Sequence, residues 1–105
     1  MKVMDGFEER QARFEARFAN DAEARFRAEA RRDKIVGRWA AAKLGHTGGA
    51  ADDYARTVVK ADMEEPGSED VYRKLRADLP ASVSDAEIRA AMADAMEEAM
   101  KDAPR

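Results

Sequence analysis

Three groups of side chains have types that enzyme or metal chemistry uses, but their spacing does not fit that chemistry. His46 is the single histidine and lies in the glycine-rich segment Gly45-His46-Thr47-Gly48-Gly49, where it fits a solvated turn residue better than a general base. This segment lacks the Gly-Lys-Ser/Thr ending of a phosphate-binding P-loop. The acidic pairs Asp52-Asp53 and Glu64-Glu65 lack metal-ligand spacing and fit charges at helix ends. We therefore predict no catalytic residue, no metal site and no enzymatic activity.

Nucleotide binding is a separate hypothesis, because basic side chains gather around the single tryptophan. Arginine and lysine pair with phosphates, and an indole ring offers a stacking surface. A basic helix face in contact with solvent explains the same pattern, and we favour it. No cofactor is required, but an ADP or ATP ligand stays open as an alternative. The residues of this candidate site are Arg31, Arg32, Lys34, Arg38 and Trp39.

Phenylalanine and arginine also recur near the N-terminus, in a pattern that indicates protein binding. At 100° per residue, Phe7, Phe14 and Phe18 fall within an arc of about 40°. Both residue types are common interface anchors, and an amphipathic helix laid in a groove is a frequent recognition mode. Alternatively, the rings extend the core and the charges are solvated. The candidate partner-binding residues are Phe7, Arg10, Arg13, Phe14, Arg17 and Phe18.

One long helix must position both sets of residues. Residues 7–44 contain no proline and one glycine, Gly37, and would span roughly 55 Å as a single helix. A compact domain of this length has a radius of gyration of only about 13 Å. Asn20, with Glu23 three residues later, also has the form of an internal helix start. We therefore predict a mobile or protruding arm over residues 1–19, mounted on a folded domain over residues 20–105.

Three further helices complete the predicted fold, an all-α four-helix bundle. The first helix ends at Gly45, the second covers about residues 50–64, and Pro66-Gly67 breaks it. Ser68 caps the third helix, which ends at Pro80, and a capping box of Ser84 and Glu87 opens the fourth. A methionine-rich stripe on the fourth helix is either core, which we favour, or a pliable binding face. The predicted apolar stripes are Tyr54, Val58, Val59 and Met63, then Val71, Leu75 and Leu79, then Ile88, Met92, Met96 and Met100.

Composition narrows the classes of function. The chain has no cysteine, which excludes disulfides, zinc–thiolate sites and thiol nucleophiles. No apolar run could span a bilayer and the start lacks a signal-peptide core, so we expect a cytoplasmic protein without membrane insertion. The net charge of −3 divides into +3 over residues 1–45 and −6 over residues 46–105.

Two weaker alternatives follow from the N-terminal segment, one from its basic residues and one from its phenylalanine stripe. Acids interleaved with its bases, and a pI near 5.3, argue against a nucleic-acid-associated helical protein. The phenylalanine stripe lacks sustained heptads, so a self-associating coiled coil is disfavoured and we expect a monomer without nucleic acid.

Nearly the whole chain resembles one family in a single register. The runs RFEARFANDAE from Arg13, FRAEARRDK from Phe26 and GRWAA from Gly37 are similar to the alphaproteobacterial zeta subunit, the inhibitor of the F-type ATP synthase. Further similar segments are Tyr54-Ala55, Val58 to Asp62, Glu69 to Val71, Arg73 to Asp78 and Ser84 to Arg89. The differences are local, at the extreme N-terminus and around His46 and Pro80.

The resemblance implies a four-helix protein that binds the catalytic head of the ATP synthase and blocks ATP hydrolysis. It implies that the mobile N-terminal segment becomes helical and wedges between alpha and beta subunits, toward the gamma stalk. In this chain that segment is about residues 1–19, where Phe14, Arg17 and Phe18 match the family best and residues 1–6 match least. The resemblance also implies a location at the inner membrane, through the ATP synthase.

Overall fold

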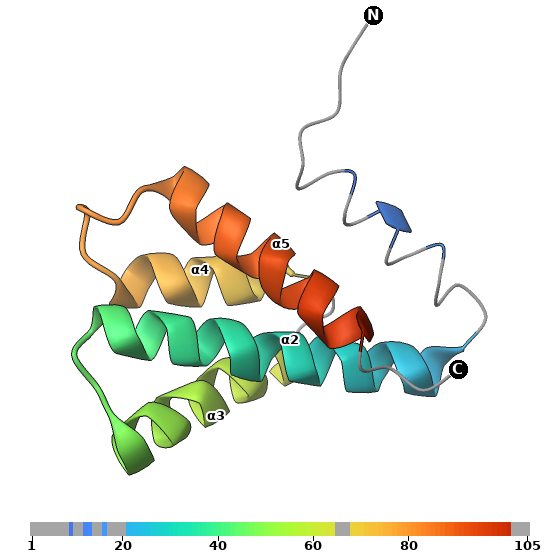
Figure 1. Ribbon diagram of the computed structural model, residues 1–105, viewed down its shortest axis with the longest axis horizontal. Coiled ribbons are helices and arrows are strands. Elements are labelled where there is room, and N and C mark those ends of the chain that lie inside the picture. The colour runs from blue at the N-terminus through green and yellow to red at the C-terminus, as the bar shows by residue number, and fades with distance from the viewer. Residues whose placement is uncertain (1–8, 10–11, 14–15, 17–20, 65–67, 102–105) are drawn as a thin grey trace, which may run out of the picture.

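Four α-helices make up the structure, a computed structural model that describes residues 9, 12–13, 16, 21–64 and 68–101 (Figure 1). They are α2 (Ala22–Lys43), α3 (Gly48–Glu64), α4 (Glu69–Asp78) and α5 (Asp85–Lys101). No strand occurs within the described ranges, and the predicted all-α four-helix fold is confirmed. Most of the predicted arm, and the predicted break at Pro66-Gly67, lie outside the described residues.

The longest helix, α2, organises the bundle. It packs along α3 and α5, while α4 contacts α3 and α5 (Figure 1). The predicted methionine stripe is core, since Met92 and Met96 are buried and Met100 is partly buried. The main core cluster contains Val36, Ala40, Val58, Val71, Leu75, Leu79, Val83, Ile88, Met92 and Ala95.

The contact between α2 and α3 depends on small residues. A Cβ atom at Gly37 would lie 2.7 Å from the Cα of Ala55 and 3.1 Å from its Cβ. These distances are shorter than van der Waals contact, so only glycine permits this approach of the two backbones. The one glycine in the predicted long helix therefore marks where α3 crosses α2.

Helix ends follow the sequence signals closely at Gly45 and at the capping box of Ser84 and Glu87. At the end of α2, Gly45 has φ of +83°, its N–H bonds to Ala42 O, and the His46 N–H bonds to Ala41 O, which is a Schellman motif. The capping box of α5 is also formed, with Ser84 Oγ accepting from Glu87 N at 3.1 Å and Glu87 Oε1 accepting from Ser84 N at 3.3 Å. Helix α3 begins two residues earlier than predicted, because Thr47 O already accepts a bond from Ala50 N.

Two residue-level predictions for α3 and α4 are wrong. Ser68 occupies the N-cap position of α4 but its side chain makes no capping hydrogen bond. Met63, predicted as part of the α3 stripe, is 67% exposed. The packed face of α3 runs through Ala55, Val58 and Asp62, and Met63 lies about 100° away from Asp62 around the helix.

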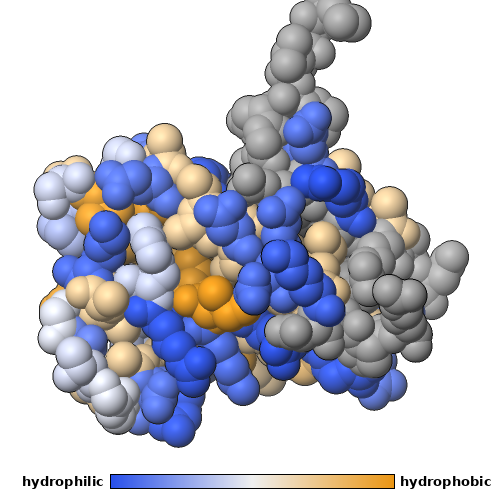
Figure 2. Space-filling view, viewed as in Figure 1, coloured by the Kyte–Doolittle hydropathy of each residue, from blue (hydrophilic) through white to orange (hydrophobic). Residues whose placement is uncertain are grey.

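The surface is mostly hydrophilic on the face that Figure 2 displays, where hydrophobic patches are small and separated by polar side chains. Among the described helices, none has the length and apolar character needed to cross a membrane.

Candidate functional site

A helix begins next to the domain boundary that the sequence predicts. Asp21 is the N-cap of α2, and its Oδ1 accepts a hydrogen bond from Ala24 N at 2.9 Å. The cap is therefore Asp21, one residue after the predicted Asn20, because Asp21 places its carboxylate over the free N–H groups of the first turn. Helix α2 therefore has its own N-terminal cap, close to the boundary that the sequence predicts.

Arg13 alone among the candidate arm residues belongs to the described part of the chain. Phe7, Arg10, Phe14, Arg17 and Phe18 lie outside the described residues. Arg13 Nη2 is 3.0 Å from Glu97 Oε1 on α5, so this arm residue contacts the bundle. The two side chains, with Met100 and Lys101, line an open hollow of about 270 Å³.

Small apolar side chains hold the start of α2 against the end of α5 beneath this contact. Ala24 and Ala28 on α2 pack against Met96, with Met100 partly buried beside them. Alanine gives the two helices a close approach, and methionine fills the irregular space between them. The start of α2 is therefore packed against the end of α5.

The nucleotide candidates do not all share one face. Arg31 and Lys34 are exposed, and Arg38 is exposed with its Nη2 3.2 Å from Asp52 Oδ1. Trp39 is half-buried, and the ammonium of Lys43 lies 5.6 Å from its ring centroid. Arg32, by contrast, is only 2% exposed and points into the bundle. The nucleotide site stays a prediction, with Arg32 placed away from any solvated basic face.

A buried charged cluster surrounds Arg32, and sequence reasoning missed it. Arg32 Nε donates to Asp33 Oδ1 at 2.6 Å, and Arg32 Nη2 is 3.5 Å from Asp62 Oδ2 on α3. Burial, with a side-chain hydrogen bond to Asp62, raises the pKa of Asp33 to about 9, although the Arg32 guanidinium acts in the opposite direction. A signal was available, because Asp33 precedes Val36 and Gly37 by one turn and so shares their packed face.

His46 lies in the loop before α3, and the acidic pair Asp52-Asp53 lies near the start of α3. His46 is exposed beside Tyr54, with ring centroids 6.1 Å apart. Asp53 Oδ1 is 2.6 Å from Arg56 Nη1, and Asp52 pairs with Arg38. No group of three metal-ligating side chains occurs among residues 21–64 and 68–101 or the few described before them.

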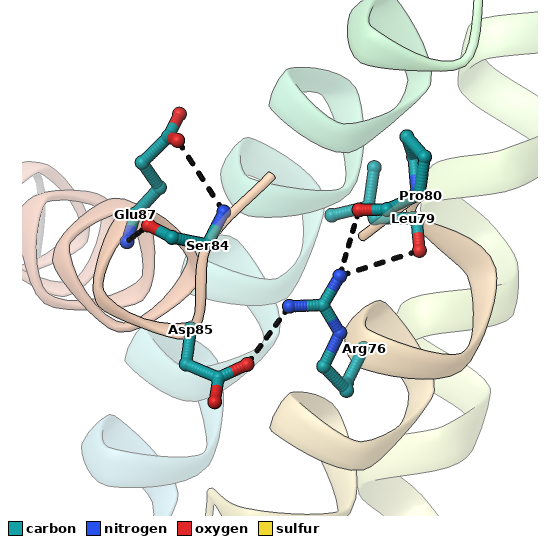
Figure 3. Close-up of polar contacts among 6 residues, drawn as sticks. All are labelled: Arg76, Leu79, Pro80, Ser84, Asp85 and Glu87. Atoms are coloured by element: carbon teal, nitrogen blue, oxygen red, sulfur yellow. Dashed lines mark hydrogen bonds and ion pairs between the residues drawn. The ribbon is translucent and has the colours of Figure 1, made fainter. Parts of the chain in front are cut away.

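An open hollow of about 530 Å³ lies at the α4–α5 corner. The guanidinium of Arg76, which lines this hollow, already makes polar contacts within the protein (Figure 3). Arg76 donates to Pro80 O at 2.8 Å and Leu79 O at 3.4 Å, and its Nη1 is 2.8 Å from Asp85 Oδ1. These bonds tie the connecting loop to both helices. We therefore interpret these contacts as stabilising the α4–α5 connection and not as forming a binding site.

Comparison with protein-family models identifies the family of the chain. A family model described as ATPase inhibitor subunit zeta matches residues 4–102. No curated protein matches the chain. The matched range includes most of the predicted arm and all four described helices, so the chain belongs to the ATPase inhibitor subunit zeta family.

Proposed function

We propose that the chain inhibits ATP hydrolysis by an F-type ATP synthase, with residues 1–19 as the inhibitory arm and the bundle as its mount. The observation that carries this proposal is the family match, which runs through the arm and the bundle without a break. Membership of an inhibitor family indicates a regulator rather than a catalyst. The separate cap at Asp21 supports different roles for the arm and the bundle, because the cap lets α2 begin there independently of the arm.

In this proposal the arm folds into a helix as it enters the interface between alpha and beta subunits, toward gamma. Folding on binding costs ordering entropy, so buried anchors must supply the affinity. Phe14 and Phe18 are the proposed anchors, flanked by Phe7. Arg10, Arg13 and Arg17 would pair with carboxylates of the enzyme. A helix in a rotary interface blocks motion by packing, so the chain needs no catalytic residue.

The test is ATP hydrolysis by an alphaproteobacterial ATP synthase catalytic head. We expect the full chain to inhibit and a chain lacking residues 1–19 to fail. The double variant Phe14→Ala with Phe18→Ala should raise the half-inhibitory concentration about tenfold or more, since a buried aromatic anchor is often worth over 2 kcal/mol.

Phe26→Ala is the matched control for these substitutions. Phe26 lies on α2, outside the arm, and is 56% exposed, so its loss should leave inhibition unchanged. Inhibition by the arm-deleted chain, or an unaltered double variant, would contradict the wedge. The protein would act in the cytoplasm, peripheral to the inner membrane through the ATP synthase, and would be monomeric when free.

Nucleotide binding is the second candidate, with no cofactor required for inhibition. Lys34, Arg31 and Arg38 are exposed near Trp39 and are the residues on which an ADP or ATP phosphate would act. Titration with ADP, followed by amide chemical shifts, should move residues 31–39. Unmoved signals at millimolar ADP would remove this candidate.

A further inference from the structure

The buried charged cluster joins three helices at one corner of the bundle. Arg32 and Asp33 come from the middle of α2, Asp62 from the last turns of α3, and Asp70 from the first turn of α4. Arg32, Asp33 and Asp70 are each at least nine-tenths buried, and the side chain of Asp62 is 13% exposed. Asp70 Oδ1 accepts from Val71 N at 3.0 Å, which fixes its carboxyl at the start of α4.

Carboxyl groups outnumber the buried guanidinium in this cluster. Glu29, one turn before Asp33 on α2, also belongs to it, because burial and the Asp62 and Asp70 charges raise its pKa. Arg25 is a second cation close to Glu29, with Nε 3.9 Å from Glu29 Oε2. Several buried anions around one arginine would repel one another strongly, so the arrangement is stable only if at least one carboxyl keeps its proton.

Asp33 is the group best placed to hold that proton. It is fully buried, and its pKa is raised to about 9, first by burial and then by hydrogen bonding with Asp62. Arg32 Nε bonds to Asp33 Oδ1 and Arg32 Nη2 pairs with Asp62 Oδ2. A protonated Asp33 would donate its proton in the side-chain hydrogen bond that it shares with the Asp62 carboxylate. One proton and one arginine thus link α2 to the end of α3.

We propose that Arg32, Asp33 and Asp62 form a proton-dependent latch that holds the end of α3, and with it the start of α4, on α2, and that opens as pH rises. Loss of the proton leaves carboxylates on α2 and α3 that share the guanidinium of Arg32, the buried cation that contacts both of them among the described residues. The α2–α5 contact of Ala24, Ala28 and Met96 contains none of these groups. The latch therefore loosens one corner of the bundle and not the whole, and it operates whatever enzyme the arm binds.

The direction of the pH effect follows from proton binding. In the unfolded chain Asp33 ionises near pH 3.9, and in the folded chain near pH 9. Between those values the folded chain binds one more proton than the unfolded chain, so stability from this group falls as pH rises and is lost above pH 9. The unfolding equilibrium constant should rise about tenfold per pH unit from this carboxyl alone.

The experiment compares urea unfolding of the full chain with the variant Asp33→Asn from pH 6 to pH 10. The amide mimics the protonated carboxyl but does not titrate. The slope of the unfolding free energy against pH should therefore decrease by the amount that about one bound proton contributes. Asp53→Asn is the matched control, because Asp53 is also an aspartate but its side chain is 75% exposed. Control and parent should share one slope, and equal slopes in all three proteins would overturn the latch.

Two readouts on the unaltered protein keep the proposal testable if Asp33→Asn does not fold. Carboxyl ¹³C shifts should show Asp33 titrating near pH 9, and a midpoint below 5 would refute the proposal. Amide-exchange protection factors at pH 7 and pH 9 should drop first over residues 58–64 and 68–72, with α5 retained. A uniform loss across all helices would show general destabilisation instead of a latch.

Discussion

Arg13 and Arg32 carry the same guanidinium group in opposite surroundings. The Arg13 side chain is 64% exposed and reaches one carboxylate on α5, whereas Arg32 is enclosed between carboxylates of α2 and α3. Sequence alone placed Arg32 with its basic neighbours on α2. Its burial depends on Asp62, a residue of another helix, and such long-range pairing leaves no local pattern in the sequence.

Glu97 is predicted to restrain the arm weakly. Substituting Glu97→Gln removes the ion pair with Arg13 and frees that arginine for the enzyme. An exposed ion pair contributes about 0–1 kcal/mol, so the half-inhibitory concentration should fall by no more than about fivefold.

Glu98→Gln is the control for this substitution. Glu98 lies beside Glu97 on α5 but pairs with Lys101, so its loss should not affect Arg13. Weaker inhibition by Glu97→Gln would instead mean that Glu97 itself contacts the enzyme.

Whole helices were easier to predict than individual contacts. The sequence located the end of α2 through Gly45 and the start of α5 through the capping box of Ser84 and Glu87. These signals act within a few residues, as does helical periodicity. Ser68 failed as a side-chain cap although its residue type fits, since its backbone has φ of −102° and ψ of −4° instead of the extended conformation that an N-cap usually has.

Gly37 is predicted to be the glycine that the α2–α3 packing cannot replace. Substituting Gly37→Ala puts a methyl group 2.7 Å from the Ala55 backbone, which forces the helices apart. Overpacking of this kind typically costs about 1–3 kcal/mol of unfolding free energy. Chemical denaturation followed by circular dichroism measures the loss.

Gly49→Ala is the control, because the same glycine-to-alanine change is expected to have the opposite effect on stability there. Gly49 lies in the first turn of α3 with open space around its Cα, and alanine is the better helix former. This variant should be stabilised by up to about 1 kcal/mol. If both substitutions destabilise equally, the close approach is not what makes Gly37 necessary.

At the scale of the molecule, the all-α bundle was predictable and the use of its surfaces was not. Apolar spacing identified the core stripes of α4 and α5, which depend only on which residues share a helix face. The assignment of Met63 to the core was wrong because Met63 lies about 100° around α3 from Asp62, which is on the packed face. The arm's binding residues stay predictions, since what they contact is another protein.

The bundle should be stable without its arm. Deleting residues 1–19 removes the Arg13–Glu97 pair but leaves the Asp21 cap and the core clusters. An exposed pair is worth at most about 1 kcal/mol, so the thermal midpoint should change by less than about 8 °C. Calorimetry on both chains, with Gly37→Ala in the full chain as the destabilised reference, would check this. A far larger drop would mean that the arm is part of the core.

Helices α2 and α5 give the molecule distinguishable ends. The start of α2 and the end of α5 lie together at the arm, since Ala24 and Ala28 pack on Met96, while Lys43 and Glu87 meet at the other end, 4.0 Å apart. The 22 residues of α2 separate these ends by about 33 Å. The chain has no cysteine, so a single one introduced at exposed Ser82 would carry a dye in the far loop. Such a dye would report arm insertion as an optical distance without touching the inserted surface.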